Sequence, residues 1–470
     1  MTDWSPTLDS HTGPRYRAIA DAIAEDIGRG TLTPGARLPT HRDLAWRLGV
    51  TVGTVTRAYK EAAARGLIDG EIGRGSFVRE RRPNGWGAVA DSVNSPIDFG
   101  LNFPPAMDQS EAALRATLAQ IASDDRGPSL AAYDPAGGRE THRACLARWL
   151  TDSGVAATTA DDVVITAGAQ NAITVALLAL TEPGDAVLCE KLTHPGFKTI
   201  AARLRVRTVP VEIDGDGVLP DALDAAIRLN RPKAIFLIPT LHNPTTATLG
   251  SERRAAVAET LGRYEVPLIE DDIYRVFAED AAISLPQPIA RSAPEHTLYL
   301  ASASKHLAPG LRVGVLRVPR PLRTRLVAAL RDTLWMAPPL MVEVLVRWLA
   351  DGTAERLTQG KRHEQAARTA LARQYLGDWL QPTSETCPHH WLALPDPWTS
   401  AEAANALRQR GVAVADGTVF ATASGAGRDH VRLALGRPEL HGSVADGLRT
   451  IAETLAENPN LAPALDREVV

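Results

Sequence analysis

The stretch Ser302-Ala-Ser-Lys-His-Leu-Ala-Pro-Gly-Leu-Arg-Val-Gly314 places one lysine, Lys305, after two serines, Ser302 and Ser304. Seven residues further on, Arg312 follows a Pro-Gly turn. Serine hydroxyls and an arginine together favour the binding of a phosphate group. A lysine held beside them can form a Schiff base with an aldehyde. The stretch therefore predicts a site for a ligand that carries both a phosphate and an aldehyde.

The composition is that of an ordinary globular protein with more than one domain. The chain has 470 residues, of which 44% are hydrophobic and 23% are charged. Its three cysteines lie far apart and lack metal-ligand spacing, so we expect a reducing compartment and no metal site. The N-terminus has no signal-peptide pattern, and no apolar run reaches membrane-spanning length. We therefore expect a cytoplasmic protein without membrane association.

Charge is distributed unevenly along the chain. Residues 14–82 hold 13 Lys and Arg against 8 Asp and Glu, a net charge of +5. The whole chain has a net charge of −4, which leaves −9 for the remainder. A basic segment on an acidic body suits a nucleic-acid-binding module attached to a metabolic domain, although chance asymmetry could produce the same difference.

Residues 14–80 show helical spacing of apolar residues and then a glycine-rich hairpin pattern. Helices are predicted at Tyr16–Ile27, from an N-cap at Thr40 to Leu48, and at Thr51–Arg65, with a hairpin wing at Leu67–Val78. The third helix is expected to turn four residues inward: Val52, Val55, Tyr59 and Ala62. The tight turn at Gly49 would place the first turns of this helix in the DNA major groove.

Several residues of this module are candidates for DNA contact because they lie on its outward positions or at the wing tip. They are Arg42, Thr51, Thr54, Thr56, Arg57, Arg74 and Gly75. Hydroxyl groups can bond phosphates or bases, and an arginine can contact either. Glycines at a wing tip allow close approach to a groove.

Residues 38–78 resemble the winged helix-turn-helix of GntR-type regulators. The matching positions are Leu38-Pro39, Arg42, Leu44-Ala45, Leu48-Gly49-Val50, Thr54-Val55, Ala58-Tyr59, Gly66-Leu67 and Gly73-x-Gly75-x-Phe77-Val78. The resemblance implies binding to a double-stranded DNA operator. Residues 81–96 have no periodicity and carry Pro, Gly and Asn, which predicts a linker.

From residue 97 onward, apolar β-rich runs alternate with helical segments. This pattern predicts a mostly parallel sheet covered by helices. Functional groups in such sheets gather at the carboxyl ends of strands. The predicted strands are Asp162–Thr166, Ala186–Glu190, Val206–Val211, Ala234–Pro239, Val266–Ile269, Thr297–Leu300 and Val313–Leu316.

Polar candidates follow three of these strands. Ala169 and Gln170 begin a helix whose backbone amides can bind phosphate. Asn243 could donate to a ring oxygen, or it could be an ordinary Asn-Pro turn residue. Asp271 or Asp272 could hold a pyridine nitrogen protonated, or instead cap a helix or bind a metal.

The order of these parts resembles fold-type I aminotransferases over residues 97–455. The resemblance implies pyridoxal 5'-phosphate (PLP) as cofactor, with Lys305 as its covalent partner and Asp271, rather than the alternative Asp272, at the pyridine nitrogen. Asn243 and Tyr274 would hold the ring oxygen. The phosphate would be held by Ser302, Ser304, Arg312 and the amides near Ala169 and Gln170. Tyr133 matches a tyrosine that reaches the neighbouring subunit's phosphate, which implies a homodimer.

Further positions follow from the same resemblance. Arg432 matches the arginine that binds a substrate α-carboxylate; a surface strand arginine is the alternative. A smaller C-terminal α+β subdomain is expected at about 340–455, followed by a tail at 456–470. The chain departs from the family at His194, where an aromatic ring usually covers the cofactor; Phe197 could supply that ring instead. Asn102 stands where enzymes often have a glycine that admits substrate.

A GntR-type head joined to an α/β fold-type I aminotransferase-like domain is the arrangement of MocR-type transcriptional regulators. The resemblance implies regulation of transcription by PLP, with or without an amino acid or amine effector, in vitamin B6 or amino-compound metabolism. A catalytically active aminotransferase with an attached DNA-binding domain is the alternative, because Asp271, Lys305 and Arg432 are all present. A body that serves only for dimerisation is a third reading, against which the presence of Lys305 argues.

Overall fold

The computed structural model divides the chain into two compact units, residues 1–84 and 85–470. It describes residues 4–6, 14–29, 31–32, 36–64, 67–71, 75–78, 96–125, 129–278, 285–437 and 441–457. Almost all of the predicted linker and tail lies outside these residues. None of the described helices combines the length and the apolar composition that a membrane span requires.

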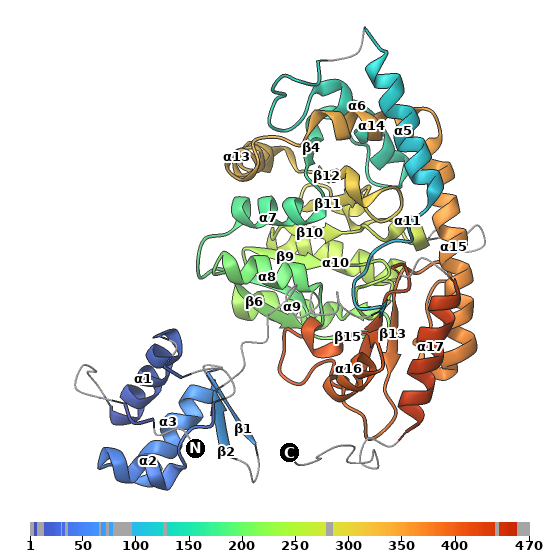
Figure 1. Cartoon of the computed structure of the whole chain (residues 1–470). Coiled ribbons are helices and arrows are strands. Elements are labelled where there is room, and N and C mark those ends of the chain that lie inside the picture. The colour runs from blue at the N-terminus through green and yellow to red at the C-terminus, as the bar shows by residue number, and fades with distance from the viewer. Residues whose placement is uncertain are drawn as a thin grey trace. The chain divides into compact units, whose positions relative to one another are not determined.

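The N-terminal unit, blue in Figure 1, is a three-helix winged helix-turn-helix. It consists of α1 (Arg15–Arg29), α2 (His41–Leu48), α3 (Val52–Ala64) and the antiparallel strands β1 (Ile68–Glu71) and β2 (Gly75–Val78). The Thr40 side chain caps α2 by accepting from the Asp43 amide, and Gly49 ends this helix with φ of 60°. The predicted helices and hairpin are therefore confirmed. The hairpin tip, with Arg74, lies outside the described residues.

The core of this unit confirms three of the four inward positions predicted for α3. Val55, Tyr59 and Ala62 are buried, and the Tyr59 hydroxyl donates to the Pro39 carbonyl at 2.8 Å. Val52 was expected to be buried, but this prediction is wrong: its side chain is 45% exposed. Val52 is the first residue of α3, so it sits at the helix end and outside the core that its later turns share with α1 and α2.

The second unit is built on a seven-stranded sheet (Figure 1). Its strand order is β4-β12-β11-β10-β9-β5-β6, and only β12 runs antiparallel to its neighbours. The strands are β4 (Val163–Thr166), β5 (Ala186–Glu190), β6 (Arg207–Val211), β9 (Ala234–Leu237), β10 (Leu268–Asp271), β11 (Thr297–Ser302) and β12 (Gly314–Arg317). All seven were predicted. Because β10 begins and ends later than expected, Asp271 is its last residue.

Helices cover both faces of this sheet (Figure 1). On one face lie α7 (Ala169–Leu180), α8 (Pro195–Arg203) and α13 (Arg323–Thr333). On the other lie α6 (Glu140–Asp152), α9 (Pro220–Asn230), α10 (Ser251–Tyr264), α12 (Ile289–Ser292) and α14 (Pro339–Ala350). The α7 sequence is almost entirely apolar because it is buried between the sheet and α13. The unit therefore has the three-layer α/β architecture that alternating strands and helices predict.

A smaller α+β subdomain has its own core around Phe99, Leu433 and Leu448. It contains β3 (Ile97–Asp98), β13 (His390–Ala393), β14 (Val412–Ala413), β15 (Ala415–Asp416), β16 (His430–Leu433), α15 (Thr353–Leu376), α16 (Ser400–Gln409) and α17 (His441–Ala456). Residues 342–357 pack instead with α6 and β4, so this subdomain begins later than residue 340. The remaining α-helices and strands among the described residues are α5 (Asp108–Ala122), α11 (Arg275–Ala278), β7 (Ile213–Asp214) and β8 (Gly217–Val218).

Candidate functional site

Lys305 follows the end of β11 and lies at the centre of the candidate site. Its Nζ donates to the Asn102 carbonyl at 2.5 Å. Burial lowers the pKa of Lys305 to about 8, with further lowering by Arg432 and an opposing effect of Asp271. A lowered pKa gives this amine a larger neutral fraction near neutral pH than an ordinary lysine has, and the neutral form is the one that attacks a carbonyl carbon.

Asp271 presents a buried carboxylate on the same side of the sheet edge as Lys305. It is 2% exposed, and its Oδ1 has no hydrogen-bond partner within the described part of the chain. Burial raises the pKa of Asp271 to about 7, which Lys305 opposes. A buried acceptor without a donor is costly, so the site suits a ligand that supplies an N–H group at this point. A protonated pyridine nitrogen meets that requirement.

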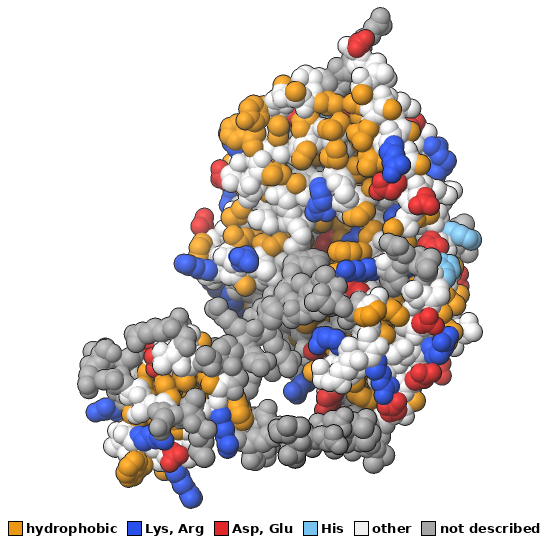
Figure 2. Space-filling view, in the orientation of Figure 1, with side chains coloured by type: hydrophobic (Ala, Val, Ile, Leu, Met, Phe, Trp, Pro, Cys, Tyr) orange, Lys and Arg blue, Asp and Glu red, His pale blue; other side chains and the backbone are white. Residues whose placement is uncertain are grey.

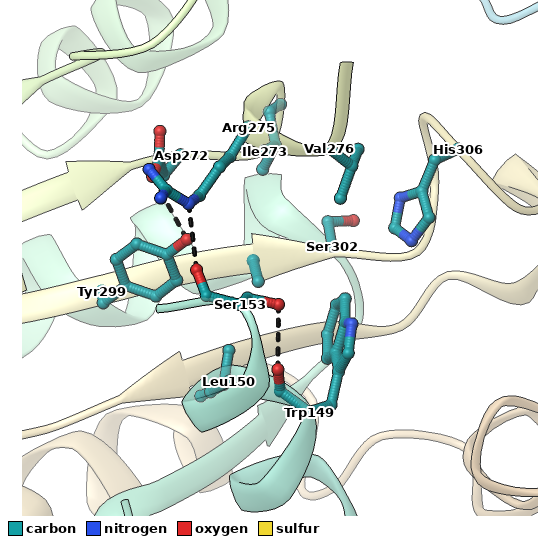
Figure 3. A pocket seen from close by; sticks show the side chains of 11 residues that line it. Trp149, Leu150, Ser153, Asp272, Ile273, Arg275, Val276, Tyr299, Ser302 and His306 are labelled. Atoms are coloured by element: carbon teal, nitrogen blue, oxygen red, sulfur yellow. Dashed lines mark hydrogen bonds and ion pairs between the residues drawn. The ribbon is translucent and has the colours of Figure 1, made fainter. Parts of the chain in front are cut away.

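Asp272 points in a different direction, into the small pocket drawn in Figure 3. Its Oδ2 accepts from the Tyr299 hydroxyl at 3.2 Å and lies 3.8 Å from the Arg275 guanidinium. Trp149 and His306 also line this pocket, whose volume of about 10 Å³ is room for roughly one water molecule. Oδ1 of both carboxylates lacks a hydrogen-bond partner among the described residues, but Asp272 has a hydroxyl donor and a cation beside it, which makes Asp271 the better candidate for a ligand.

The Tyr274 hydroxyl joins several polar side chains beside Lys305. It accepts from Asn102 Nδ2 at 3.0 Å and also interacts with Asn243. Burial raises the pKa of the Tyr274 phenol, so the hydroxyl stays protonated and can donate to a ring oxygen. Arg432 lies in the middle of β16, is 3% exposed, and donates to Asn243 Oδ1 at 3.3 Å and to the Gly100 carbonyl. A buried arginine here is not a surface strand residue.

Arg312 and the N-terminus of α7 form the opposite end of the site. Arg312 donates to Ser304 Oγ at 3.2 Å and to the Ala167 carbonyl at 3.4 Å. Gly168 precedes α7 with φ of 84°, and a Cβ there would lie 2.6 Å from the Arg312 guanidinium. The positive φ favours glycine here, and any side chain would also displace the Arg312 guanidinium. The first amides of α7, at Ala169 and Gln170, thus lie beside a fixed guanidinium, which is an arrangement that suits a phosphate group.

His194 and Phe197 occupy clearly different environments. Phe197 is fully buried in the core and stacks on Phe236 with ring centroids 4.2 Å apart. His194 contacts Gln170 Oε1 at 3.2 Å. Burial lowers the pKa of His194 to about 3, and the nearby cations Lys305 and Arg432 lower it further. The neutral imidazole therefore lies within the candidate site, whereas the Phe197 ring is committed to the core.

Tyr133 lies apart from Lys305 on the surface of the same chain. Its side chain is 82% exposed and contacts the Trp335 ring with centroids 6.0 Å apart. The structure of one chain does not bring this tyrosine to the phosphate end of the site.

Two residues of the site were not assigned a role by sequence reasoning. His389 is fully buried, and its Nε2 lies 3.0 Å from the His242 carbonyl, so Nε2 carries the proton and Nδ1 is an acceptor. Asn102 Nδ2 lies 3.4 Å from that Nδ1, which orients the Asn102 amide toward Tyr274. The unusual Asn102 was a visible signal in the sequence. His389 gave none, because it lies in no motif and outside every strand that the sequence predicted.

Five of the seven candidates for DNA contact lie on or next to α2 and α3. Arg42, Thr51, Thr56 and Arg57 are exposed, and Thr54 is half-buried. Gly75 begins β2, and Arg74 lies outside the described residues. The Arg57 guanidinium lies over the Tyr16 ring, 4.2 Å from its centroid. The helix-turn-helix thus brings the candidates onto one module, with Arg57 turned toward α1.

Comparison with known families agrees with both units. Residues 94–441 match the family described as aminotransferase class I and II, and residues 15–78 match the bacterial regulatory proteins of the gntR family. The chain is similar in fold to an archaeal alanine:glyoxylate aminotransferase, with a TM-score of 0.70, 24% identity, and 78% and 95% of the two chains covered. It is also similar to the kynurenine aminotransferase of Pyrococcus horikoshii, with a TM-score of 0.71, 21% identity, and 78% and 93% covered.

Relatives that match over most of the chain are transcriptional regulators. The HTH-type transcriptional regulator YdeF of Bacillus subtilis is 29% identical over 454 residues, 96% of each chain. The vitamin B6 salvage pathway transcriptional repressor PtsJ of Salmonella typhimurium is 30% identical over 417 residues, 87% of this chain and 91% of its own. Fold and site together define a winged-helix DNA-binding unit joined to an aminotransferase-type domain. The chain belongs to the MocR-type branch of the GntR-family transcriptional regulators.

The raised pKa of Asp271 predicts a pH dependence of stability in ligand-free protein. The folded state binds this proton more tightly, so unfolding free energy falls as pH rises from the ordinary value of 3.8 toward about 7. The wild-type protein should therefore lose free energy of unfolding on the order of a few kcal/mol across this range, and Asp271→Asn should not show that loss. Urea unfolding at several pH values measures it, with Asp332→Asn at an exposed carboxylate as control. Parallel pH profiles for Asp271→Asn and wild type would contradict the assignment.

Proposed function

We propose that this transcriptional regulator senses PLP, an amino acid or amine effector, or both, and controls genes of vitamin B6 or amino-compound metabolism. The proposal rests on the site around Lys305 and on the relatives of the chain. PtsJ is named a vitamin B6 salvage pathway repressor, and PdxR of Corynebacterium glutamicum, 26% identical over 374 residues and covering 77% of this chain and 78% of its own, is named a pyridoxine biosynthesis regulator.

The residues around Lys305 fit PLP by their chemistry. Lys305 would bind the aldehyde carbon, Asp271 the pyridine nitrogen, and Tyr274 with Asn243 the ring oxygen. Arg312, the serines Ser302 and Ser304, and the first amides of α7 would hold the phosphate, and His194 would cover the ring. When bound, PLP supplies an electrophilic carbon that exchanges its lysine for another amine. Arg432 would hold the carboxylate of an amino acid by a bidentate contact.

One observation carries the regulatory part of the proposal. Lys305 donates to the Asn102 carbonyl, and Arg432 donates to the Gly100 carbonyl. Both carbonyls belong to the segment Asp98–Pro105, which comes soon after the predicted linker to the DNA-binding unit. A ligand that occupies either cation competes with these hydrogen bonds. Ligand binding therefore changes the hydrogen bonds that hold this segment, which follows the linker to the DNA-binding unit. A ligand couples two sites when it stabilises one of two conformations more than the other.

We also propose that the protein is a homodimer. Figure 2 shows hydrophobic side chains gathered on the second unit around α13 and α14. Large exposed hydrophobic residues near this region include Tyr133, Leu334 and Trp335. A surface with this much exposed aromatic area favours association. In a dimer, Tyr133 could reach the partner's phosphate group, which it does not approach within its own chain.

A working aminotransferase is a second candidate function. It is favoured by the joint presence of Asp271, Tyr274, Lys305 and Arg432 around one site, since these residues could hold both PLP and an amino acid. Multiple turnovers with an amino donor and a keto acceptor would support it. Binding of the amine without turnover supports the regulator.

Lys305→Ala should abolish covalent attachment of PLP. After incubation with PLP and borohydride reduction, peptide mass spectrometry of wild type should locate the added mass on Lys305, because its lowered pKa makes it the reactive amine. Lys191→Ala, at a lysine paired with Glu212, is the matched control and should retain the adduct. An adduct on another lysine of the wild-type protein would contradict the assignment of Lys305.

Arg432→Lys should weaken the response to carboxylate-bearing effectors. It keeps the positive charge but loses the two-pronged contact that an arginine makes with a carboxylate. We expect an amino acid that shifts operator affinity of the wild-type protein to require roughly tenfold more ligand in the variant. The matching amine without a carboxylate is the control and should act equally on both proteins. An unchanged dose response to the amino acid would remove Arg432 from the effector site.

A further inference from the structure

The outward face of α3 differs from the surface that its sequence suggests. Its exposed positions near the N-terminus are Val52, Gly53, Thr56, Arg57 and, one turn later, Lys60. Hydroxyl groups and Arg57 are the groups on this face that could read base edges by hydrogen bonding. The structure gives most of them other partners within the N-terminal unit.

The threonine hydroxyls are occupied by local hydrogen bonds. Thr51 Oγ1 accepts from the Thr54 amide at 3.2 Å and lies 2.9 Å from Thr54 Oγ1, so this pair caps the start of α3. Thr56 Oγ1 donates to the Val52 carbonyl at 3.0 Å and lies 3.1 Å from His41 Nδ1. A hydroxyl that donates to its own helix cannot also donate to DNA.

The arginine of this face is also engaged. The Arg57 guanidinium lies 4.2 Å from the centroid of the Tyr16 ring, within the range of a cation–π interaction. It is therefore turned along the protein surface toward α1. Because the long Arg57 side chain extends toward Tyr16, only short side chains cover the first turn of α3.

The groups that remain at the first turns of α3 are apolar and small. Val52 is 45% exposed, and the Thr56 methyl faces outward because its hydroxyl faces the helix and His41. Around Gly53, a Cβ would meet nothing nearer than Thr51 Oγ1 at 3.8 Å, so the surface there is open. Such a face can approach the floor of a major groove closely. Thymine is the one base that presents a methyl group there.

We propose that Val52, with the Thr56 methyl beside it, recognises the 5-methyl group of a thymine in each half of the operator. This inference rests on the proposed DNA-binding function and specifies its chemistry. Sequence discrimination at that base pair then comes from apolar contact, while exposed cations such as Lys60 contact phosphates without reading sequence. The recognised base pair is A·T, and its identity depends on one methyl group.

Replacing thymine by deoxyuridine removes only that methyl group. The full-length protein is used to select its preferred site from random duplex DNA, and each thymine of the selected site is then replaced singly. We expect wild type to bind about fourfold more weakly at one position per half-site, the loss expected for one buried methyl group. Val52→Ala should bind the thymine and deoxyuridine duplexes equally at that position.

Lys60→Ala is the matched control, because its exposed side chain lies on the same face. It should weaken binding to both duplexes by the same factor and reduce the salt dependence of binding. Equal binding of thymine and deoxyuridine by wild type at every position would overturn the inference while leaving DNA recognition intact. The inference is also overturned if Val52→Ala still shows the full wild-type difference in affinity between the thymine and deoxyuridine duplexes. Failure of wild type to select any sequence would contradict the proposed function instead.

Discussion

Two cations, the partly buried Lys305 and the buried Arg432, hold the segment Asp98–Pro105 by its backbone carbonyls, and the rest of the site is arranged around them. Lys305 bonds the Asn102 carbonyl, and Arg432 bonds the Gly100 carbonyl. Burial lowers the pKa of both, to about 8 and about 10. Carboxylates oppose this lowering only in part, Asp271 at Lys305 and Asp98 at Arg432, so lost hydration of the two cations is incompletely compensated. The site is therefore set up for ligands that bring an anionic group or take over the lysine nitrogen.

The same arrangement suggests how an aminotransferase fold can serve as a sensor. In an enzyme, contacts to the ligand are used to stabilise a transition state. Here the contacts that a ligand would displace support a segment that connects to the DNA-binding unit. Asn102 has three roles in this network, since its carbonyl accepts from Lys305, its amide donates to Tyr274, and His389 fixes its orientation. A glycine at this position could provide only the first of them.

Much of the fold followed from local patterns in the sequence. The seven strands alternate with helices of clear periodicity, and the residues around Lys305 sit at strand ends, where parallel sheets collect polar groups. Which of two adjacent carboxylates faces the ligand was not predictable from composition. Asp271 ends β10 and Asp272 lies just beyond it, so strand alternation does not decide between them, and the contacts of Asp272 with Tyr299 and Arg275 identify its side. His389 was missed because its role arises from contacts between residues almost 290 positions apart.

Val52 illustrates a different limit of sequence reasoning. Apolar periodicity places it in line with Val55 and Tyr59, but periodicity does not reveal where the neighbouring helices stop covering α3. Likewise, α14 reads equally well as part of either subdomain. Its partners, α6 and β4, come from a distant part of the chain. Both differences concern tertiary contacts, which local sequence patterns do not reveal.

The most direct test of the account is the affinity of the wild-type protein for DNA from its own upstream region, compared between PLP-loaded and PLP-free protein. Both are measured at one fixed salt concentration, because protein–DNA affinity depends strongly on salt. If PLP binding at Lys305 changes the hydrogen bonds that hold the segment Asp98–Pro105, the two affinities for DNA differ several-fold. Equal affinities, with PLP shown to be bound, would contradict coupling between this site and the DNA-binding unit.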